Sequence, residues 1–170
     1  MVQSIELNQQ GSAPVQDSPY LSLELDQQTS IFIELKYIRE TLILPVDRIA
    51  QIPNVHPCLV GLVEHRGSIF WVVDLPQLFS GTGIDTNAIA IHVAVLQVGD
   101  LFLGLGVYRI GKVQTISQDR IYPLDEQQQI SPLVKPLIQG FVVDRAEINL
   151  HQGYLINVEA MMNFDFNLVS

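Results

Sequence analysis

Residues 59–79, with the sequence LVGLVEHRGSIFWVVDLPQLF, decide how the rest of the chain folds. Two short apolar runs rich in Val, Ile, Phe and Trp flank a polar break, a pattern that favours two buried strands over a helix. The break is His65-Arg66-Gly67-Ser68. Gly67 can adopt the positive φ that closes a hairpin, either in the turn itself or as a bulge glycine just after it. We therefore predict a β-hairpin with Arg66 at its tip.

A short helix should follow this hairpin. Asp74 is placed to cap the helix N-terminus, and the apolar residues after it have the spacing that buries one helical face. The same plan returns near the end of the chain, where Asn157 stands in the capping position before Met161 and Met162. Two copies of strand, cap and helix predict two similar lobes.

Short strands dominate the remaining sequence, and the protein is expected to be mainly β. Besides the hairpin, we expect strands at Leu21–Leu25, Ile31–Leu35, Thr41–Leu44, Ala88–Val98, Leu101–Val107, Lys112–Ile116, Ile138–Val143 and Tyr154–Val158. Tyr108–Gly111 is interpreted as a helical turn stopped by glycine, and residues 1–18 as a mobile tail. Nine or ten short strands are accommodated most economically by two small five-stranded barrels packed side by side.

The composition is that of an acidic chain with a large core. The 170 residues suit one domain or two small lobes, and 48% apolar with only 16% charged residues predicts extensive burial. The formal net charge is −9 and the basic residues are scattered, which argues against a nucleic-acid partner. A single cysteine and the lack of a visible signal peptide or membrane-spanning run predict a cytoplasmic protein without membrane insertion.

The sequence shows no signature of catalysis or metal binding. Its four histidines lie far apart, without the spacing of a metal site. No carboxylate pair is placed for acid–base work, and no G-x-S-x-G elbow surrounds a serine. Cys58, followed by an apolar run, is predicted to be a buried, inert thiol. We expect a non-catalytic protein without metal or cofactor; the alternative is a small-ligand-binding β-barrel protein or enzyme.

The hairpin and helix resemble the signature of CheW-like domains, adaptors that couple chemoreceptors to histidine kinases. The matching residues are Gly61, Arg66, Gly67, Val73, Asp74 and Leu75. Glu64 and His65 stand where the family usually has Asn and Leu. Residues 20–26, 104–113 and 152–162 resemble further family segments, although Tyr108 replaces a usual Asp, so the likeness covers most of the chain.

The resemblance implies two intertwined five-stranded SH3-like barrels with a shared core, over residues 19–166. It also implies a chemosensory adaptor that couples the cytoplasmic tip of a methyl-accepting receptor to the regulatory domain of a CheA-like histidine kinase. Such an adaptor would serve chemotaxis, phototaxis or pilus-driven motility and would associate with membrane-bound receptor arrays.

Four residues are the candidate partner-binding set implied by this resemblance. Ile38 and Glu40 match a Val-x-Glu segment of the receptor groove, and Arg66 matches the family's arginine. Ile38, by position alone, is as well suited to the core as to a contact. His65, in place of the usual Leu, brings a second potential charge to the groove.

Overall fold

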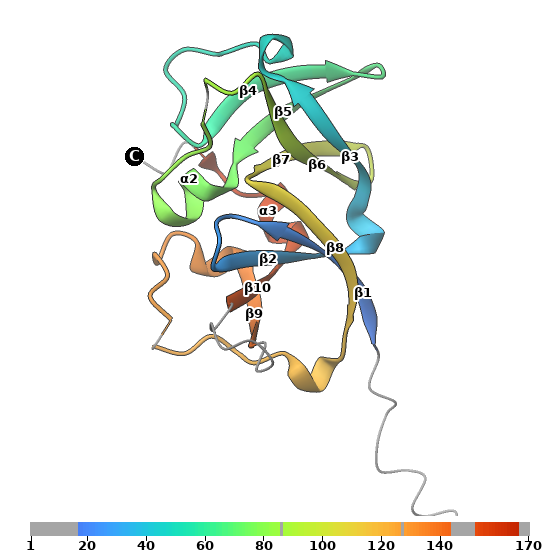
Figure 1. Cartoon of the computed structure of the whole chain (residues 1–170), viewed down its shortest axis with the longest axis vertical. Coiled ribbons are helices and arrows are strands. Elements are labelled where there is room, and N and C mark those ends of the chain that lie inside the picture. Colours follow the sequence, from blue (N-terminus) through green and yellow to red (C-terminus); the bar gives the residue numbers. More distant parts are fainter. Residues whose placement is uncertain (1–16, 86, 127, 144–151, 167–170) are drawn as a thin grey trace, which may run out of the picture.

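The computed structural model describes residues 17–85, 87–126, 128–143 and 152–166, which form two β lobes (Figure 1). Most of the expected 1–18 tail lies outside the described residues, and the first strand begins at Ser18. The strands are β1 (Ser18–Glu24), β2 (Thr29–Glu34), β3 (Ile38–Pro45), β4 (Leu59–His65), β5 (Ser68–Asp74), β6 (Ala90–Val98), β7 (Leu101–Val107), β8 (Arg109–Ile116), β9 (Ile138–Val143) and β10 (Gln152–Ile156). The helices are α2 (Leu75–Ser80) and α3 (Val158–Met162), with short 3-10 turns η2 (Leu35–Tyr37), η3 (Val46–Arg48), η4 (Gln118–Arg120) and η5 (Lys135–Leu137).

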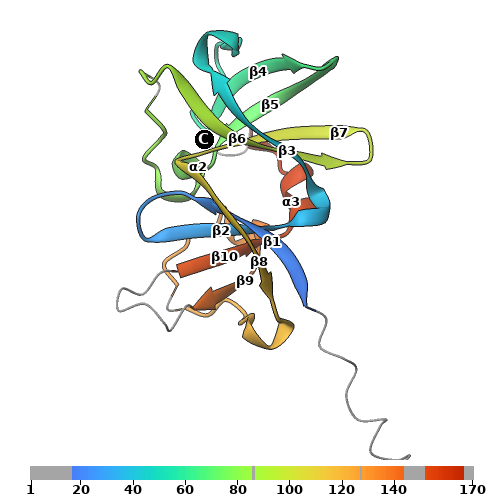
Figure 2. The same cartoon turned by 45° about the vertical axis from the view of Figure 1, so that its right-hand side comes forward.

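Each lobe is a five-stranded sheet assembled from strands that are far apart in sequence. Lobe 1 has the order β3-β6-β7-β5-β4, and lobe 2 has the order β8-β1-β2-β10-β9. Lobe 2 thus combines the first two strands of the described chain with its last three, and the chain crosses between lobes after β2 and after β7 (Figures 1 and 2). Each sheet contains one parallel pair, β5 with β7 and β10 with β2. The expected pair of intertwined five-stranded lobes is confirmed.

Both lobes bring a connecting segment back against an edge strand in the same way. An isolated bridge joins Ala50 to Leu62 in lobe 1, and another joins Tyr122 to Phe141 in lobe 2. A glycine lies beside each bridge. Gly61 adopts a φ of 154°, and a Cβ there would collide with the Ala50 carbonyl oxygen, while Gly140 is similarly crowded by Tyr122. Only glycine permits so close a backbone approach.

Three apolar clusters make up the core of the described part of the chain. One fills lobe 1 with Leu44, Ile49, Val63, Phe70, Val72, Ile91, Val93 and Val95, and a smaller one fills lobe 2 with Tyr20, Phe32, Ile116, Val142 and Leu155. The largest cluster draws buried side chains from both sheets and from α2 and α3. Leu21 and Leu23 of β1 and Leu25, which directly follows β1, belong to it, so this alternation points the leucines at the core shared by the lobes. This shared core was also expected.

The repeated cap-and-helix plan is present in both lobes. The Asp74 carboxylate accepts a hydrogen bond of 2.9 Å from the Gln77 backbone N–H at the start of α2. The Asn157 side chain accepts one of 3.0 Å from the Ala160 N–H at the start of α3. Among the described residues, no helix is long and apolar enough to cross a membrane.

The helical turn expected at Tyr108–Gly111 is wrong. The strand β8 begins at Arg109, where it pairs with Glu24 of β1, and the side chains of these two residues form a two-pronged ion pair. Ladder pairing with a distant strand therefore overrides the local helical spacing. Several strand bounds also differ from those expected. The strand β1 begins at Ser18 rather than Leu21, β2 at Thr29 rather than Ile31, and β6 at Ala90 rather than Ala88. The strand β3 begins at Ile38 rather than Thr41, and β10 ends at Ile156, so that Asn157 caps α3.

Candidate functional site

The tip of the β4–β5 hairpin is a two-residue turn formed by Arg66 and Gly67. His65 pairs with Ser68, and the two residues between them have φ values of 50° and 82°. Two successive positive φ angles define a type I′ turn, whose twist suits the flanking strands. Gly67 is thus in the turn itself rather than in a bulge after it. The backbone of Arg66 is in the left-handed region, which residues other than glycine rarely adopt. The sequence did not predict this backbone strain.

Glu40 reaches this hairpin tip from β3. Its Oε1 lies 3.0 Å from His65 Nε2, and its Oε2 lies 3.5 Å from Arg66 Nη1. The side chains of Glu40 and His65 are only 18% and 15% exposed, whereas that of Arg66 is 74% exposed. The tertiary structure therefore brings together three of the four candidate residues. The Glu40 carboxylate lies between the His65 imidazole and the Arg66 guanidinium.

The atoms His65 Nε2 and Glu40 Oε1 lie close together, but their geometry is not that of an aligned hydrogen bond. The Nε2 atom of His65 is buried, and no hydrogen-bond partner with suitable geometry lies near it among the described residues. The carboxylate of Glu40 at 3.0 Å is nonetheless its neighbour. A buried polar nitrogen is costly without compensation, and the Glu40 carboxylate compensates this one when Nε2 carries the ring proton.

A β-bulge in β3 sets the positions of the candidate residues on that strand. The pairing of β3 with β6 shifts between Ile38, opposite Leu96, and Glu40, opposite Val95, so that Arg39 is the extra residue. Bulges commonly redirect side chains beside functional sites. Ile38 is half-buried and packs against the core shared by the lobes, apart from the charged cluster.

Arg39 is a neighbour of the cluster that sequence reasoning missed. Its Nη1 donates a 2.7 Å hydrogen bond to Gln97 Oε1, and its guanidinium lies 5.5 Å from the centre of the Phe102 ring. Arg39, Arg66 and Arg48, whose Nη2 donates a 3.3 Å hydrogen bond to the Glu64 carbonyl, are three exposed arginines in lobe 1 of a chain of net charge −9. The sequence could have indicated Arg39 as a neighbour of the site, because it lies between the two predicted contact residues Ile38 and Glu40.

The base of the hairpin is fixed by a buried polar arrangement around Asp74. The Asp74 backbone N–H donates to the Cys58 carbonyl at 2.6 Å, which joins the two ends of the hairpin. Its carboxylate also accepts a 2.8 Å bond from the Ile84 N–H. Burial raises the pKa of Asp74, although its hydrogen bonds oppose the change. The Cys58 thiol lies 3.0 Å from His56 Nδ1, and burial followed by the nearby Asp74 charge raises its pKa to about 11.

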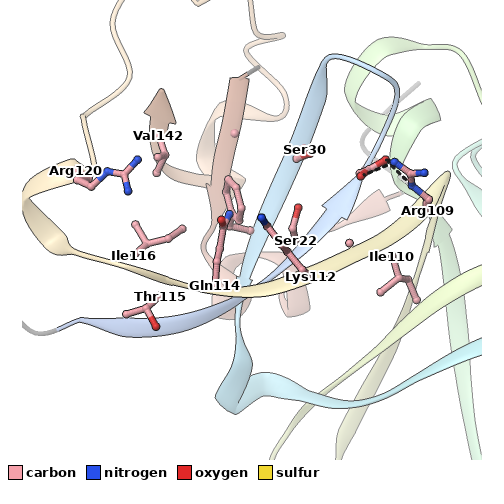
Figure 3. A pocket seen from close by; sticks show the side chains of 14 residues that line it. Ser22, Ser30, Arg109, Ile110, Lys112, Gln114, Thr115, Ile116, Arg120 and Val142 are labelled. Carbon is pink, nitrogen blue, oxygen red and sulfur yellow. Dashed lines mark hydrogen bonds and ion pairs between the residues drawn. The ribbon is translucent and has the colours of Figure 1, made fainter. Parts of the chain in front are cut away.

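Two open hollows lie away from the hairpin tip. One, of about 540 Å³, lies in lobe 2 beside β1 and β8 (Figure 3). The other, of about 740 Å³, lies between the β1–β2 turn and the loop after α2. Neither hollow includes any of the four candidate residues in its lining. Within the described residues, no three His, Cys, Asp or Glu side chains gather as a metal site would require.

The two five-stranded sheets define a two-lobed β domain. The CheW-like domain family matches residues 19–164, and this chain belongs to that family. The family is one of scaffolds and adaptors in chemotaxis signalling. No curated protein matches the chain in sequence.

A solved structure has the same architecture. It is the crystal structure of the scaffolding protein TtCheW from Thermoanaerobacter tengcongensis, which matches with a TM-score of 0.68 at 18% sequence identity. The match covers 84% of this chain and 90% of that one. At this level of identity, the likeness establishes the fold.

Proposed function

We propose that this protein is a non-catalytic adaptor that couples methyl-accepting receptors to a CheA-like histidine kinase. The observation that carries this proposal is the cluster of Glu40, His65 and Arg66 at the hairpin tip of a CheW-like fold. Glu40 lies on β3 and Arg66 lies in the turn between β4 and β5, and their side chains approach to 3.5 Å. The proposal assigns receptor binding to this cluster and kinase binding to pairing between similar β lobes.

Arg66 is the proposed anchor for the receptor. Its guanidinium has five N–H donors, and Glu40 contacts only Nη1 at 3.5 Å, so most of the group faces solvent. The receptor tip is helical, and a helix that docks in a groove combines an apolar stripe with polar residues that fix its register. Glu40 limits the range of Arg66 orientations, which reduces the entropy lost when a partner carboxylate binds.

The neighbouring residues would have supporting roles. Ile38, two residues before Glu40, packs against the core shared by the lobes and offers a half-buried apolar surface. His65 is largely buried, so its part would be to hold Glu40 rather than to touch the receptor. Among these residues, Arg66 is expected to contribute most to the binding energy. Arginine is one of the residue types that dominate binding energy at interfaces, and Glu40 holds this exposed side chain in place.

The test is receptor co-sedimentation with Arg66→Ala, Arg66→Gly and the control Arg120→Ala. Loss of a charged interface anchor weakens binding roughly tenfold or more. The 3.5 Å pair with Glu40 is exposed on the arginine side, so Arg66→Ala should change stability by less than about 0.5 kcal/mol. Arg66→Gly also relieves the positive φ and should raise stability by ~0.5 kcal/mol while binding is still lost.

Arg120 is an exposed arginine in lobe 2, and its replacement should leave co-sedimentation unchanged. Thermal melting of all three variants separates folding from binding. Wild-type co-sedimentation by a normally folded Arg66→Ala protein would refute the assignment of the hairpin tip as the receptor contact.

A further inference from the structure

The interiors of the two lobes are filled differently, although their strand orders correspond. Among the described residues, and apart from the shared core, the lobe 1 cluster has eight buried apolar side chains and the lobe 2 cluster has five. Towards one end of lobe 2, β1 and β2 contribute Ser22 and Ser30, which are 9% and 2% exposed, instead of large apolar residues. The space that remains is the open hollow of about 540 Å³. Its volume lies in the range of small-molecule sites.

This hollow has an apolar floor and a polar rim. The floor is made by Phe32, Ile116 and Val142, which belong to the lobe 2 cluster and are 6%, 2% and 7% exposed. Lys112 and Gln114 are two residues apart on β8, so their side chains lie on the same face of the sheet. Figure 3 shows both side chains pointing towards the hollow.

Positive charge is concentrated around the rim. Arg109, Lys112 and Arg120 line it, which is three of the nine basic residues in a chain of net charge −9. Glu24 neutralises Arg109 through contacts of 2.8 to 3.0 Å. Within the part of the chain that the structure describes, neither Lys112 nor Arg120 has an ion-pair partner. Figure 3 shows the Arg120 guanidinium turned from η4 towards the hollow.

We propose that this hollow binds a small organic anion. Its carboxylate or phosphate group would lie between Lys112 and Arg120, and its apolar body would cover Phe32, Ile116 and Val142. An arginine fork and a lysine ammonium are the side chains that bind such groups, and the Gln114 amide adds a further donor. A compact molecule suits the space, because the floor lies inside the lobe and not on its outer surface. This site is separate from the hairpin tip and independent of the proposed adaptor role.

The experiment is a titration of the full chain at low ionic strength, followed by amide NMR shifts. The probes are phenyl phosphate, inorganic phosphate and the neutral benzyl alcohol. We expect phenyl phosphate to bind with a dissociation constant of about 1 mM or tighter and to shift the amides of residues 112–116. Inorganic phosphate should bind more weakly, because it leaves the floor uncovered, and benzyl alcohol should not bind, because it lacks the charge.

Two double variants carry equal changes of charge. Lys112→Gln with Arg120→Gln should weaken phenyl phosphate binding roughly tenfold or more, since each lost charged partner removes a strong hydrogen bond. Lys36→Gln with Lys135→Gln removes two distant cations and should leave binding unchanged. Equal loss in both variants, shifts confined to residues that do not line the hollow, or no binding at about 10 mM phenyl phosphate would overturn the proposal. An acidic protein segment that binds this face while phenyl phosphate does not would also overturn it.

Discussion

Replacement of Asp74 tests how the hairpin that carries Arg66 is held at its base. Asp74 is 5% exposed, and its carboxylate accepts backbone hydrogen bonds of 2.9 Å from Gln77 and 2.8 Å from Ile84. Asp74→Ala removes a helix cap worth about 1 kcal/mol and a charge-assisted bond worth about 1.5–3 kcal/mol. The desolvation cost of the buried carboxylate is recovered at the same time. We expect a net loss of about 2–3 kcal/mol in the free energy of unfolding at pH 7.

Asn157→Ala is the matched control in the other lobe. Asn157 occupies the equivalent cap but is exposed, and its side chain accepts one bond, 3.0 Å from the Ala160 N–H. Its replacement should cost only about 1 kcal/mol. Asp74→Asn should fall between these values, because a single amide oxygen can serve Gln77 or Ile84 but not both. Urea unfolding followed by circular dichroism measures all three losses; equal losses for Asp74→Ala and Asn157→Ala would refute the reasoning.

The pH dependence gives an independent check on Asp74. Burial raises the pKa of this carboxyl above its ordinary value of 3.8. The folded protein therefore keeps the proton to higher pH than the unfolded chain, and ionisation of Asp74 lowers stability as the pH rises past that value. Asp74→Ala does not titrate at this position, so the stability gap to wild type should widen as the pH falls from neutrality towards 4. A gap that narrows over this range would contradict the buried-carboxylate account.

Two further predictions concern the backbone and the thiol. Gly61→Ala should destabilise the protein by more than about 2 kcal/mol in urea unfolding, because its Cβ would collide with the Ala50 carbonyl oxygen. Gly99→Ala, at a φ of 59° but with open space around it, should cost only about 1 kcal/mol, and similar losses would show that contact at Gly61 is unimportant. Cys58, buried and with its pKa raised to about 11, should react with Ellman's reagent at pH 8 only as the protein unfolds. Rapid labelling of the folded protein would contradict this.

Local patterns were sufficient to predict most elements of the fold. The hairpin of residues 59–74, the cap at Asp74 and the paired strands around Gly99 depend on neighbouring residues, and each is present in the structure. Alternation of apolar and polar residues indicates a strand with one buried face, whichever strand it pairs with. The resemblance carried by Arg66, Gly67 and Val73–Leu75 pointed to the CheW-like family, to which the chain belongs.

Long-range pairing lay beyond those patterns. The strand start at Arg109 depends on Glu24, which is 85 residues away, and helical spacing alone was misleading there. The shared carboxylate of Glu40 likewise requires β3 to approach the β4–β5 turn, a contact that no spacing in the sequence encodes. The role of Ile38, Glu40, His65 and Arg66 in partner binding stays a prediction.

The sequence by itself therefore determined where strands, turns and caps occur, because these depend on backbone propensity and on which face of a segment is apolar. Tertiary structure alone decided which strands are neighbours, including the parallel pairs β5–β7 and β10–β2. It also decided that lobe 2 keeps a hollow with a polar rim beside Lys112 and Arg120. The physical reason is that burial of an apolar face can be satisfied by many partners. The choice among them is made only when all side chains of both lobes compete to fill one closely packed interior.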